Sequence, residues 1–216
     1  MKMKQKLMAS AIALSTMAGF AVPAAHADVA ATVGASNMYY WRGLDLGVDA
    51  DTGKGSSASV WGDLKYSESG FYAGVWGGSG DANMGNEYDL YAGYGSTIGD
   101  FKYDLSVWTY SYPSAQSPLS PGDLSEAVLM LGYGPVAFTY YDNIAGGAGY
   151  TYMTLAATFG DFTVKYGEHK DSMSHVDLTY AFNSKVSFTL GKVVDDVDGA
   201  FSDEAQFVVG FTLPIE

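Results

Sequence analysis

Hydrophobic and polar positions alternate with a period of two along most of the chain after about residue 28. The clearest run is 101–110, where one face would carry Phe101, Tyr103, Leu105, Val107 and Thr109 and the other Lys102, Asp104, Ser106, Trp108 and Tyr110. Residues 162–167, 175–182 and 206–215 alternate in the same way. This period is typical of β-strands whose faces meet different surroundings, and no stretch shows a helical period. The pattern predicts an all-β protein.

About twelve such strands fit the sequence, each of about ten residues, the length that a tilted strand needs to cross a bilayer. Their predicted starts lie near Val29, Ser57, Gly70, Glu87, Phe101, Leu124, Val136, Tyr150, Phe162, His175, Lys185 and Glu204.

Short turns and longer polar connections alternate between these strands. The short turns are 67–69, Gly99-Asp100, Gly134-Pro135, Gly160-Asp161 and Asn183-Ser184; the longer connections are 44–56, 79–86, 113–123, 142–149, 169–174 and 194–203. Outer-membrane barrels place short turns on the periplasmic side and longer loops outside. We therefore expect a closed antiparallel up-and-down transmembrane β-barrel, with both termini on the periplasmic side and an even number of strands.

Aromatic residues gather at both ends of the predicted strands. At the loop ends stand Tyr39, Tyr40, Trp41, Trp76, Trp108, Tyr110, Tyr112, Tyr140, Tyr141 and Tyr150, and at the turn ends Tyr66, Phe71, Phe101, Tyr133, Phe159, Phe162 and Phe182. Two aromatic girdles are typical of the two membrane–water interfaces. The alternative is an ordinary β-sandwich core, which gives no reason for loop length to sort by end.

The first 27 residues have the three parts of a secretory signal peptide. Lys2, Lys4 and Lys6 precede an apolar stretch over 7–20, and Ala25-His26-Ala27 is an A-x-A cleavage site. The apolar stretch is too short to cross a bilayer as a helix. We expect cleavage to leave residues 28–216 as a single barrel domain.

Loss of the three signal lysines changes the net charge from −13 to −16. So acidic a chain is not expected to bind nucleic acid, whose phosphates require a basic surface. The chain has no cysteine, which excludes thiolate metal sites and a thiol nucleophile. We expect no cofactor and no metal.

Four segments resemble a known group of outer-membrane proteins. They are Ser-Asn-Met-Tyr-Tyr-Trp-Arg-Gly at 36–43, and residues 69–77, 87–94 and 99–113. In these segments the chain is similar to the TorF-type porin family of proteobacteria, and the resemblance extends over the mature chain. It implies an outer-membrane channel and supplies no catalytic residues.

Charged residues on the polar strand faces are expected to line the lumen, because a lysine or arginine facing lipid at the midplane costs about 2–4 kcal/mol. These candidates are Arg42, Asp63, Lys65, Glu87, Asp89, Lys102, Asp104, Glu126, Lys165, His175, Asp177 and Lys185. They would form either a charged constriction that sorts solutes by sign or mutual salt bridges that fill the barrel. Twelve strands lie between the filled eight-stranded and the open sixteen-stranded barrels, so a narrow pore is expected. Whether a loop folds into it stays open.

The predicted outer loops are acidic, with Asp45, Asp49, Asp51, Asp81, Asp195, Asp196 and Asp198. Such loops are a solvated surface, or they enrich cations at the mouth of a pore. Asp195, Asp196 and Asp198 could also offer oxygens to calcium, but they lack the spacing of an EF-hand loop.

Enzymatic activity is not expected. After the signal peptide the only histidines are His169 and His175, and Ser172 and Ser174 stand too close in sequence for the usual triad geometry.

The predicted function is passive diffusion of small hydrophilic solutes or ions across the outer membrane of a Gram-negative bacterium, with a weak preference for cations. The expected partners are outer-membrane lipid and the barrel-assembly machinery, and a homo-oligomer is left open. One alternative is a plugged barrel that acts through its loops as an adhesin, a receptor or a structural protein. Another is a soluble periplasmic β-sandwich.

Overall fold

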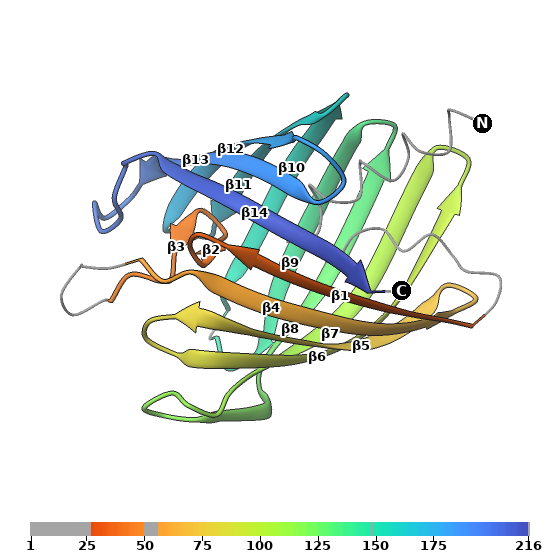
Figure 1. The fold of residues 1–216 in the computed structure, drawn as a ribbon, viewed down its shortest axis with the longest axis horizontal. Helices are drawn as coiled ribbons and strands as arrows, with labels where there is room; N and C mark the ends of the chain where they lie inside the picture. Colours follow the sequence, from red (N-terminus) through yellow and green to blue (C-terminus); the bar gives the residue numbers. More distant parts are fainter. Residues whose placement is uncertain (1–26, 50–55, 148, 216) are drawn as a thin grey trace.

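The alternating segments form the strands of a closed antiparallel barrel in the computed structural model, which describes residues 27–49, 56–147 and 149–215 (Figure 1). Its twelve strands are β1 (Asp28–Ser36), β4 (Ser59–Glu68), β5 (Phe71–Asp81), β6 (Gly85–Ile98), β7 (Phe101–Tyr112), β8 (Leu119–Tyr133), β9 (Val136–Ala145), β10 (Thr151–Phe159), β11 (Phe162–His169), β12 (Met173–Ala181), β13 (Val186–Asp196) and β14 (Gln206–Ile215). The predicted fold class is confirmed. The largest difference in a strand start is at β8, which begins at Leu119 and not near Leu124. The predicted signal peptide lies outside the described residues, apart from Ala27.

Each strand pairs with its neighbours in the chain, and β1 closes the barrel by pairing with both β14 and β4. Short turns join the strands at the end where β1 begins and β14 ends, and the longer connections lie at the other end (Figure 1). Gly99, Gly134 and Gly160 each open a two-residue turn with φ of 63°, 55° and 62°. Such left-handed conformations suit the tight turns of β-hairpins.

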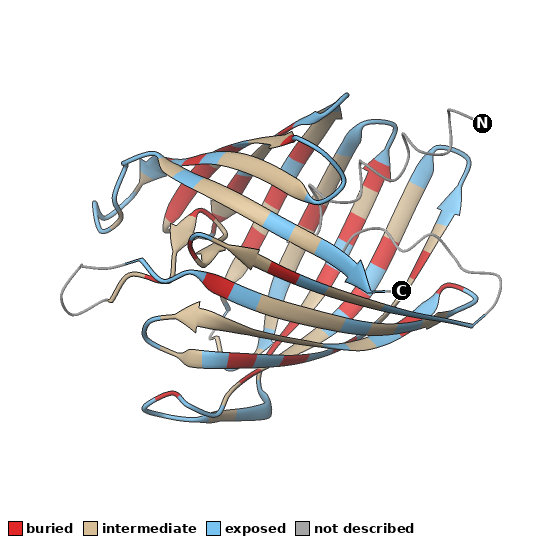
Figure 2. Cartoon of the chain, in the orientation of Figure 1, coloured by how far each residue is buried: buried red, intermediate tan, exposed pale blue. Residues whose placement is uncertain are grey.

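The two faces of the wall differ as the alternation predicts. On β7, Leu105 and Val107 point outwards and are 58% and 49% exposed, whereas Asp104 and Ser106 point inwards and are 2% exposed. Exposed and buried residues likewise alternate along many of the other strands (Figure 2). The barrel therefore has an apolar outside and a polar, tightly filled inside.

A second, two-stranded sheet lies apart from the wall, in the connection between β1 and β4. Its strands are β2 (Tyr40–Trp41) and β3 (Leu44–Asp45), paired Tyr40 to Asp45 and Trp41 to Leu44. Arg42 and Gly43 form the turn with φ of 47° and 90°, as a type I′ hairpin requires at both positions. We call residues 39–46 the inner hairpin, because its side chains bind wall residues on β6, β8 and β12 across the lumen.

The predicted aromatic girdle at the loop end is wrong for seven of its ten members. Tyr39, Tyr40 and Trp41 belong to the inner hairpin, and four further tyrosines point into the lumen: Tyr110, Tyr112, Tyr141 and Tyr150. At the turn end the prediction fits better, since Tyr66, Phe71, Phe101, Tyr133, Phe159, Phe162 and Phe182 are all exposed on the outside.

Candidate functional site

The described lumen holds most of the predicted lining residues. Asp63, Lys65, Glu87, Asp89, Asp104, Glu126, Lys165, His175 and Asp177 lie on wall strands and interact with other lumenal groups. Lys102 shares its face of β7 with Asp104. Two predictions need correction. Lys185 lies exposed in the turn before β13, and Arg42 belongs to the inner hairpin and not to the wall.

The tip of the inner hairpin is fixed by one doubly bonded ion pair. The Nη1 and Nη2 atoms of Arg42 lie 2.9 and 2.6 Å from the two carboxylate oxygens of Glu126 on β8, and both side chains are buried. The Glu126 carboxylate also accepts a hydrogen bond of 2.7 Å from Tyr110. Burial alone would lower the pKa of Arg42, but hydrogen bonding to Glu126 and its charge raise that pKa well above the ordinary value. The arginine therefore stays a cation in the lumen.

Aromatic rings surround the same guanidinium group. Its central carbon lies 4.3 Å from the ring centre of Tyr141, 4.4 Å from Trp41 and 4.8 Å from Tyr152. An arginine stacked between aromatic faces gains cation–π attraction, which is stronger where water is excluded. Its left-handed backbone costs free energy that such contacts must offset.

His169 ties the backbone of the hairpin tip to the wall. Its Nε2 lies 2.8 Å from the carbonyl oxygen of Arg42, and its Nδ1 lies 2.9 Å from the Tyr150 hydroxyl. Because the carbonyl can only accept, Nε2 carries the hydrogen, and Nδ1 accepts from the tyrosine.

A second anchor lies on the wall formed by β11–β13. Tyr40 donates to the Asp177 carboxylate at 2.7 Å, and the same carboxylate pairs with Lys165 at 2.7 Å and with Nδ1 of His175 at 3.0 Å. The Nε2 atom of His175 lies 2.8 Å from the Tyr152 hydroxyl. His175 and Asp177 are buried at the centre of this network, and the Lys165 side chain is 18% exposed at its edge.

Glycines on this wall make room for the hairpin. A Cβ at Gly191 would overlap the Tyr40 hydroxyl, and one at Gly167 would overlap His175 and Tyr152. At the hairpin tip, a Cβ on Gly43 would approach His175 to within 2.5 Å. Backbone and rings therefore approach more closely here than any larger residue would allow.

A third contact joins the hairpin to β6. Tyr39 and Tyr112 both donate to the Glu87 carboxylate, Tyr112 at 2.8 Å. Burial and the neighbouring Glu87 carboxylate raise the pKa of Tyr39, so its hydroxyl remains a donor. Between the hairpin and the β6–β9 side of the wall lies a cavity of about 190 Å³.

Towards the turn end the lumen is filled by side chains of the wall itself. Tyr91 donates to Asp63 at 2.8 Å, Tyr72 donates to Asp104 at 2.7 Å, and Lys65 lies 5.8 Å from the ring centre of Tyr72. Salt bridges and hydrogen bonds thus fill the lumen, as one of the two predicted roles of its charges requires, and the sorting of solutes by sign stays a prediction.

The acidic loop residues mostly cap their own loops. Asp45 accepts from Gly47 and Ser56, Asp81 accepts from Asn83 and Met84, and Asp196 accepts from Asp198 and Phe201. Asp195 and Asp198 are exposed, Asp49 is half-buried, and Asp51 lies outside the described residues. Across the described ranges no three histidine or carboxylate groups come together as metal ligands, so the calcium alternative gains no support.

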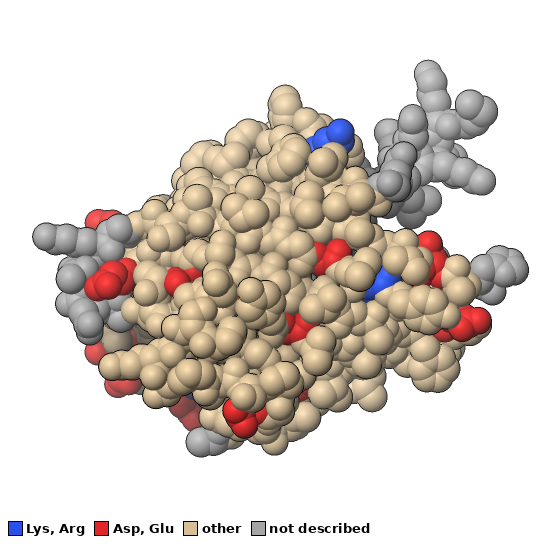
Figure 3. All heavy atoms as spheres, turned by 60° about the horizontal axis from the view of Figure 1, so that its bottom comes forward, with Lys and Arg blue, Asp and Glu red and all other residues tan. Residues whose placement is uncertain are grey.

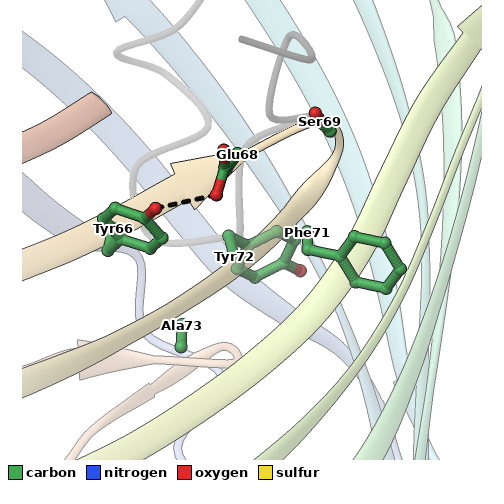
Figure 4. A pocket seen from close by; sticks show the side chains of 6 residues that line it. All are labelled: Tyr66, Glu68, Ser69, Phe71, Tyr72 and Ala73. Carbon is green, nitrogen blue, oxygen red and sulfur yellow. Dashed lines mark hydrogen bonds between the residues drawn. The ribbon is translucent and has the colours of Figure 1, made fainter. Parts of the chain in front are cut away.

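Most of the face seen in Figure 3 is uncharged, and its acidic residues are scattered in small groups. A depression of about 360 Å³ lies at the turn between β4 and β5 (Figure 4). It is lined by Tyr66, Glu68, Ser69, Phe71, Tyr72 and Ala73, and Tyr66 donates to Glu68 at 2.9 Å. Within the described part of the chain there is no helix that combines the length and apolarity needed to cross a membrane.

Neither described histidine is placed to activate a serine. His169 uses its ring nitrogens on Tyr150 and Arg42, and His175 uses its own on Asp177 and Tyr152. Both rings are thus engaged in holding the hairpin and the wall together.

Comparison with known proteins identifies a family for this chain but no function. This chain is similar to a solved structure of outer membrane phospholipase A from Escherichia coli, in an active-site mutant form. The match covers 97% of this chain and 98% of the phospholipase chain, with 10% sequence identity and a TM-score of 0.43. No curated protein matches. These findings do not confirm the resemblance to TorF-type porins. A family model described as "Bacterial protein of unknown function (Gcw_chp)" matches residues 20–208. The chain therefore belongs to the Gcw_chp family of bacterial proteins of unknown function.

Proposed function

We propose that this chain is an outer-membrane channel for small hydrophilic solutes and ions, that it prefers cations, and that the inner hairpin holds it closed in the described conformation. The observation that carries the proposal is a separate hairpin, rich in aromatic residues and with Arg42 at its tip, lodged in an acidic lumen and joined to it mainly by side chains.

Placement in a membrane is supported by the outer face. Large apolar side chains such as Leu64, Leu90, Leu105, Leu155 and Leu190 are about half exposed there. Soluble proteins rarely expose so continuous an apolar surface. The wall strands have 8 to 15 residues, enough to cross the hydrocarbon layer at a tilt. A soluble sandwich would bury this face.

A channel role is supported by how the hairpin is attached. β2 and β3 form their own sheet and add no strand to the barrel, so their removal would leave the wall ladder intact. Without the hairpin, Glu87, Asp89 and Glu126 would face an open lumen with no described cation bonded to them. A carboxylate-lined passage favours cations.

The second candidate is a permanently plugged barrel that acts through its loops. It is favoured by the burial of the Arg42–Glu126 pair and by the tyrosines that fill the lumen towards the turn end. The described structure fits both candidate functions. They differ in whether the inner hairpin can leave the lumen.

Planar-bilayer recording separates them. The refolded mature chain is compared with a variant in which residues 39–46 are replaced by a short Gly-Ser linker, in a KCl gradient. We expect rare openings for the parent and steady, cation-selective current for the variant. A matched control replaces the exposed residues 198–200 in the same way and should behave as the parent.

Silence from a folded barrel without its hairpin would refute the channel and favour the plugged barrel. An anion-selective current would refute the role assigned to the lumenal carboxylates. Folding of each protein is checked by circular dichroism and by its heat-dependent gel mobility.

A further inference from the structure

The cavity between the inner hairpin and the wall is walled by aromatic rings and carboxylates. Its lining consists of Trp41, Glu87, Tyr110, Tyr112, Leu124, Glu126, Asn143, Gly147 and Tyr150. Trp41 comes from the hairpin, and the other residues come from β6 to β9 and the connection to β10. The cavity thus lies where a solute would pass between the hairpin and the wall.

The charges around this cavity do not balance. Glu126 is paired with Arg42, whereas Glu87 receives two tyrosine hydroxyls and lies within hydrogen-bonding reach of Asp89, which also interacts electrostatically with Glu126. On the β11–β13 side, Lys165 forms its ion pair with Asp177. Two buried carboxylates therefore share one place without a described cation.

Asp89 shows most directly that these buried carboxylates lack partners. The residue is 4% exposed, and its Oδ1 atom is buried without a hydrogen-bond partner among the described residues. Asp89 follows Glu87 on the same, inward face of β6. An unpartnered buried carboxylate oxygen is costly, and such atoms usually mark a missing proton, ion or ligand group.

We propose that this cavity binds a small organic monocation, such as an alkylated ammonium ion. Glu87 in the lining, and Asp89 in contact with Glu87, supply the charge, and the rings of Trp41, Tyr110 and Tyr112 supply the walls. Aromatic faces attract an alkylammonium, as aromatic cages do for quaternary ammonium groups. A volume of about 190 Å³ suits a cation of a few heavy atoms and excludes a bulky one.

Other ligand classes fit less well. A divalent metal needs several oxygen or nitrogen ligands at short range, and the described residues bring no three such groups together. An anion would meet Glu87, Asp89 and Glu126 with only Arg42 to attract it, and that arginine is already bonded through both terminal nitrogens. The excess of carboxylates and rings selects a cation with an apolar surface.

This inference names a ligand class for the lumen, and it rests on the proposed function only for the route by which the cation arrives. Binding to the closed barrel needs no conduction. The two proposals can therefore fail separately, because one is tested by binding in micelles and the other by current through a bilayer.

The test is saturation-transfer NMR and calorimetry of tetramethylammonium with the refolded mature chain in maltoside micelles, which carry no ammonium group. We expect saturable binding, weakened by about tenfold in Glu87→Gln and in Asp89→Asn. The matched control Asp63→Asn removes a lumenal carboxylate nearer the turn end, bonded by Tyr91, and should bind as the parent does. Asp89→Asn keeps the size of the side chain and removes no hydrogen bond at Oδ1, so it should fold.

Three results would overturn the proposal. They are no saturable binding to the folded parent chain, equal binding of the neutral probe tert-butanol, and equal weakening by Asp63→Asn. The first would mean that a proton neutralises the Glu87–Asp89 pair. A barrel that binds tetramethylammonium but stays silent without its hairpin would refute the channel and keep this site.

Discussion

Two sides of the lumen each present a buried aspartate to the inner hairpin, and they neutralise it differently. On the β11–β13 side, Asp177 has Lys165, His175 and Tyr40 around it. On the β6–β8 side, Asp89 is equally buried, but one of its oxygens has no partner and its charged neighbours are glutamates. Both sides bind the hairpin, through Asp177 on one and Glu126 on the other, but only the second leaves a buried aspartate oxygen without a partner.

The difference shows that a buried charged side chain can contribute either to stability or to ligand binding. A buried charge with complete partners holds its neighbours firmly, and removal of one partner is expensive. A buried charge without partners destabilises the empty protein, and a ligand that supplies the countercharge recovers that cost. The same residue type, at similar depth, is therefore expected to respond to the same substitution in opposite ways.

The largest expected effect is that of Asp177→Asn. The change leaves Lys165 without its counterion in a buried network, which should lower the free energy of unfolding by about 3–5 kcal/mol. Urea-induced unfolding in micelles measures it. The exposed Asp195→Asn is the matched control and should change stability by less than about 0.5 kcal/mol. An equal effect of both would show that the network around Asp177 adds nothing to stability.

Arg42→Leu should have the second largest effect on stability. It removes a doubly bonded ion pair, but the hairpin can then leave the lumen and let Glu126 hydrate, so we expect a loss of about 2–3 kcal/mol. If the proposed channel function holds, the time spent open in bilayer recordings should rise. A double-mutant cycle with Glu126→Leu isolates the pair, and Lys170→Leu in an exposed loop is the control. Additive effects of the two changes would show that the pair does not hold the hairpin.

Gly191→Ala tests the anchored side by shape alone. A methyl group there would overlap the Tyr40 hydroxyl and displace the hairpin from β13, at a cost of about 1–3 kcal/mol. Faster proteolysis of the 37–58 connection would report the displacement. Gly62→Ala on β4 is the control, because a Cβ there meets only ordinary contacts at 3.7 Å. A hairpin equally protected in both variants would contradict the packing described.

Asp89→Asn should have the smallest effect, and the opposite sign. It removes a buried charge that has no counterion, so stability should rise by about 1 kcal/mol while cation binding weakens. Unfolding with and without tetramethylammonium measures both effects in one series. A loss of stability comparable with that of Asp177→Asn would mean that Asp89 is as well partnered as Asp177.

Much of the barrel could be predicted from sequence because a period of two is a local property of each strand. Leu105 and Asp104 had to face opposite ways whatever the rest of the chain does, and the Gly99-Asp100 turn limits where β6 and β7 meet. The inner hairpin was missed because Tyr39, Tyr40 and Trp41 were interpreted as part of an aromatic girdle at the loop end of the first strand. The signal that could have found it is the Arg42-Gly43 pair, a weak two-residue turn motif between Trp41 and Leu44.

The lumenal network was harder to predict because it joins residues far apart in the chain. Strand parity correctly placed Glu87, Asp89, Glu126 and Asp177 inside, but it says nothing of which cation each one meets. The same strand parity also argues against part of the predicted aromatic girdle. Tyr110 and Tyr112 share the face of Asp104, so they could not also belong to an outward girdle.

In the chain, the inner hairpin precedes every wall strand except β1. Its own turn needs only neighbouring residues, but its anchors lie 84 residues away at Glu126 and 137 residues away at Asp177. Contacts of such long range form late, since each must wait for the intervening chain to be ordered. We therefore expect the hairpin to dock only once β12 is in place, so that a docked Arg42 marks a barrel whose assembly is almost complete.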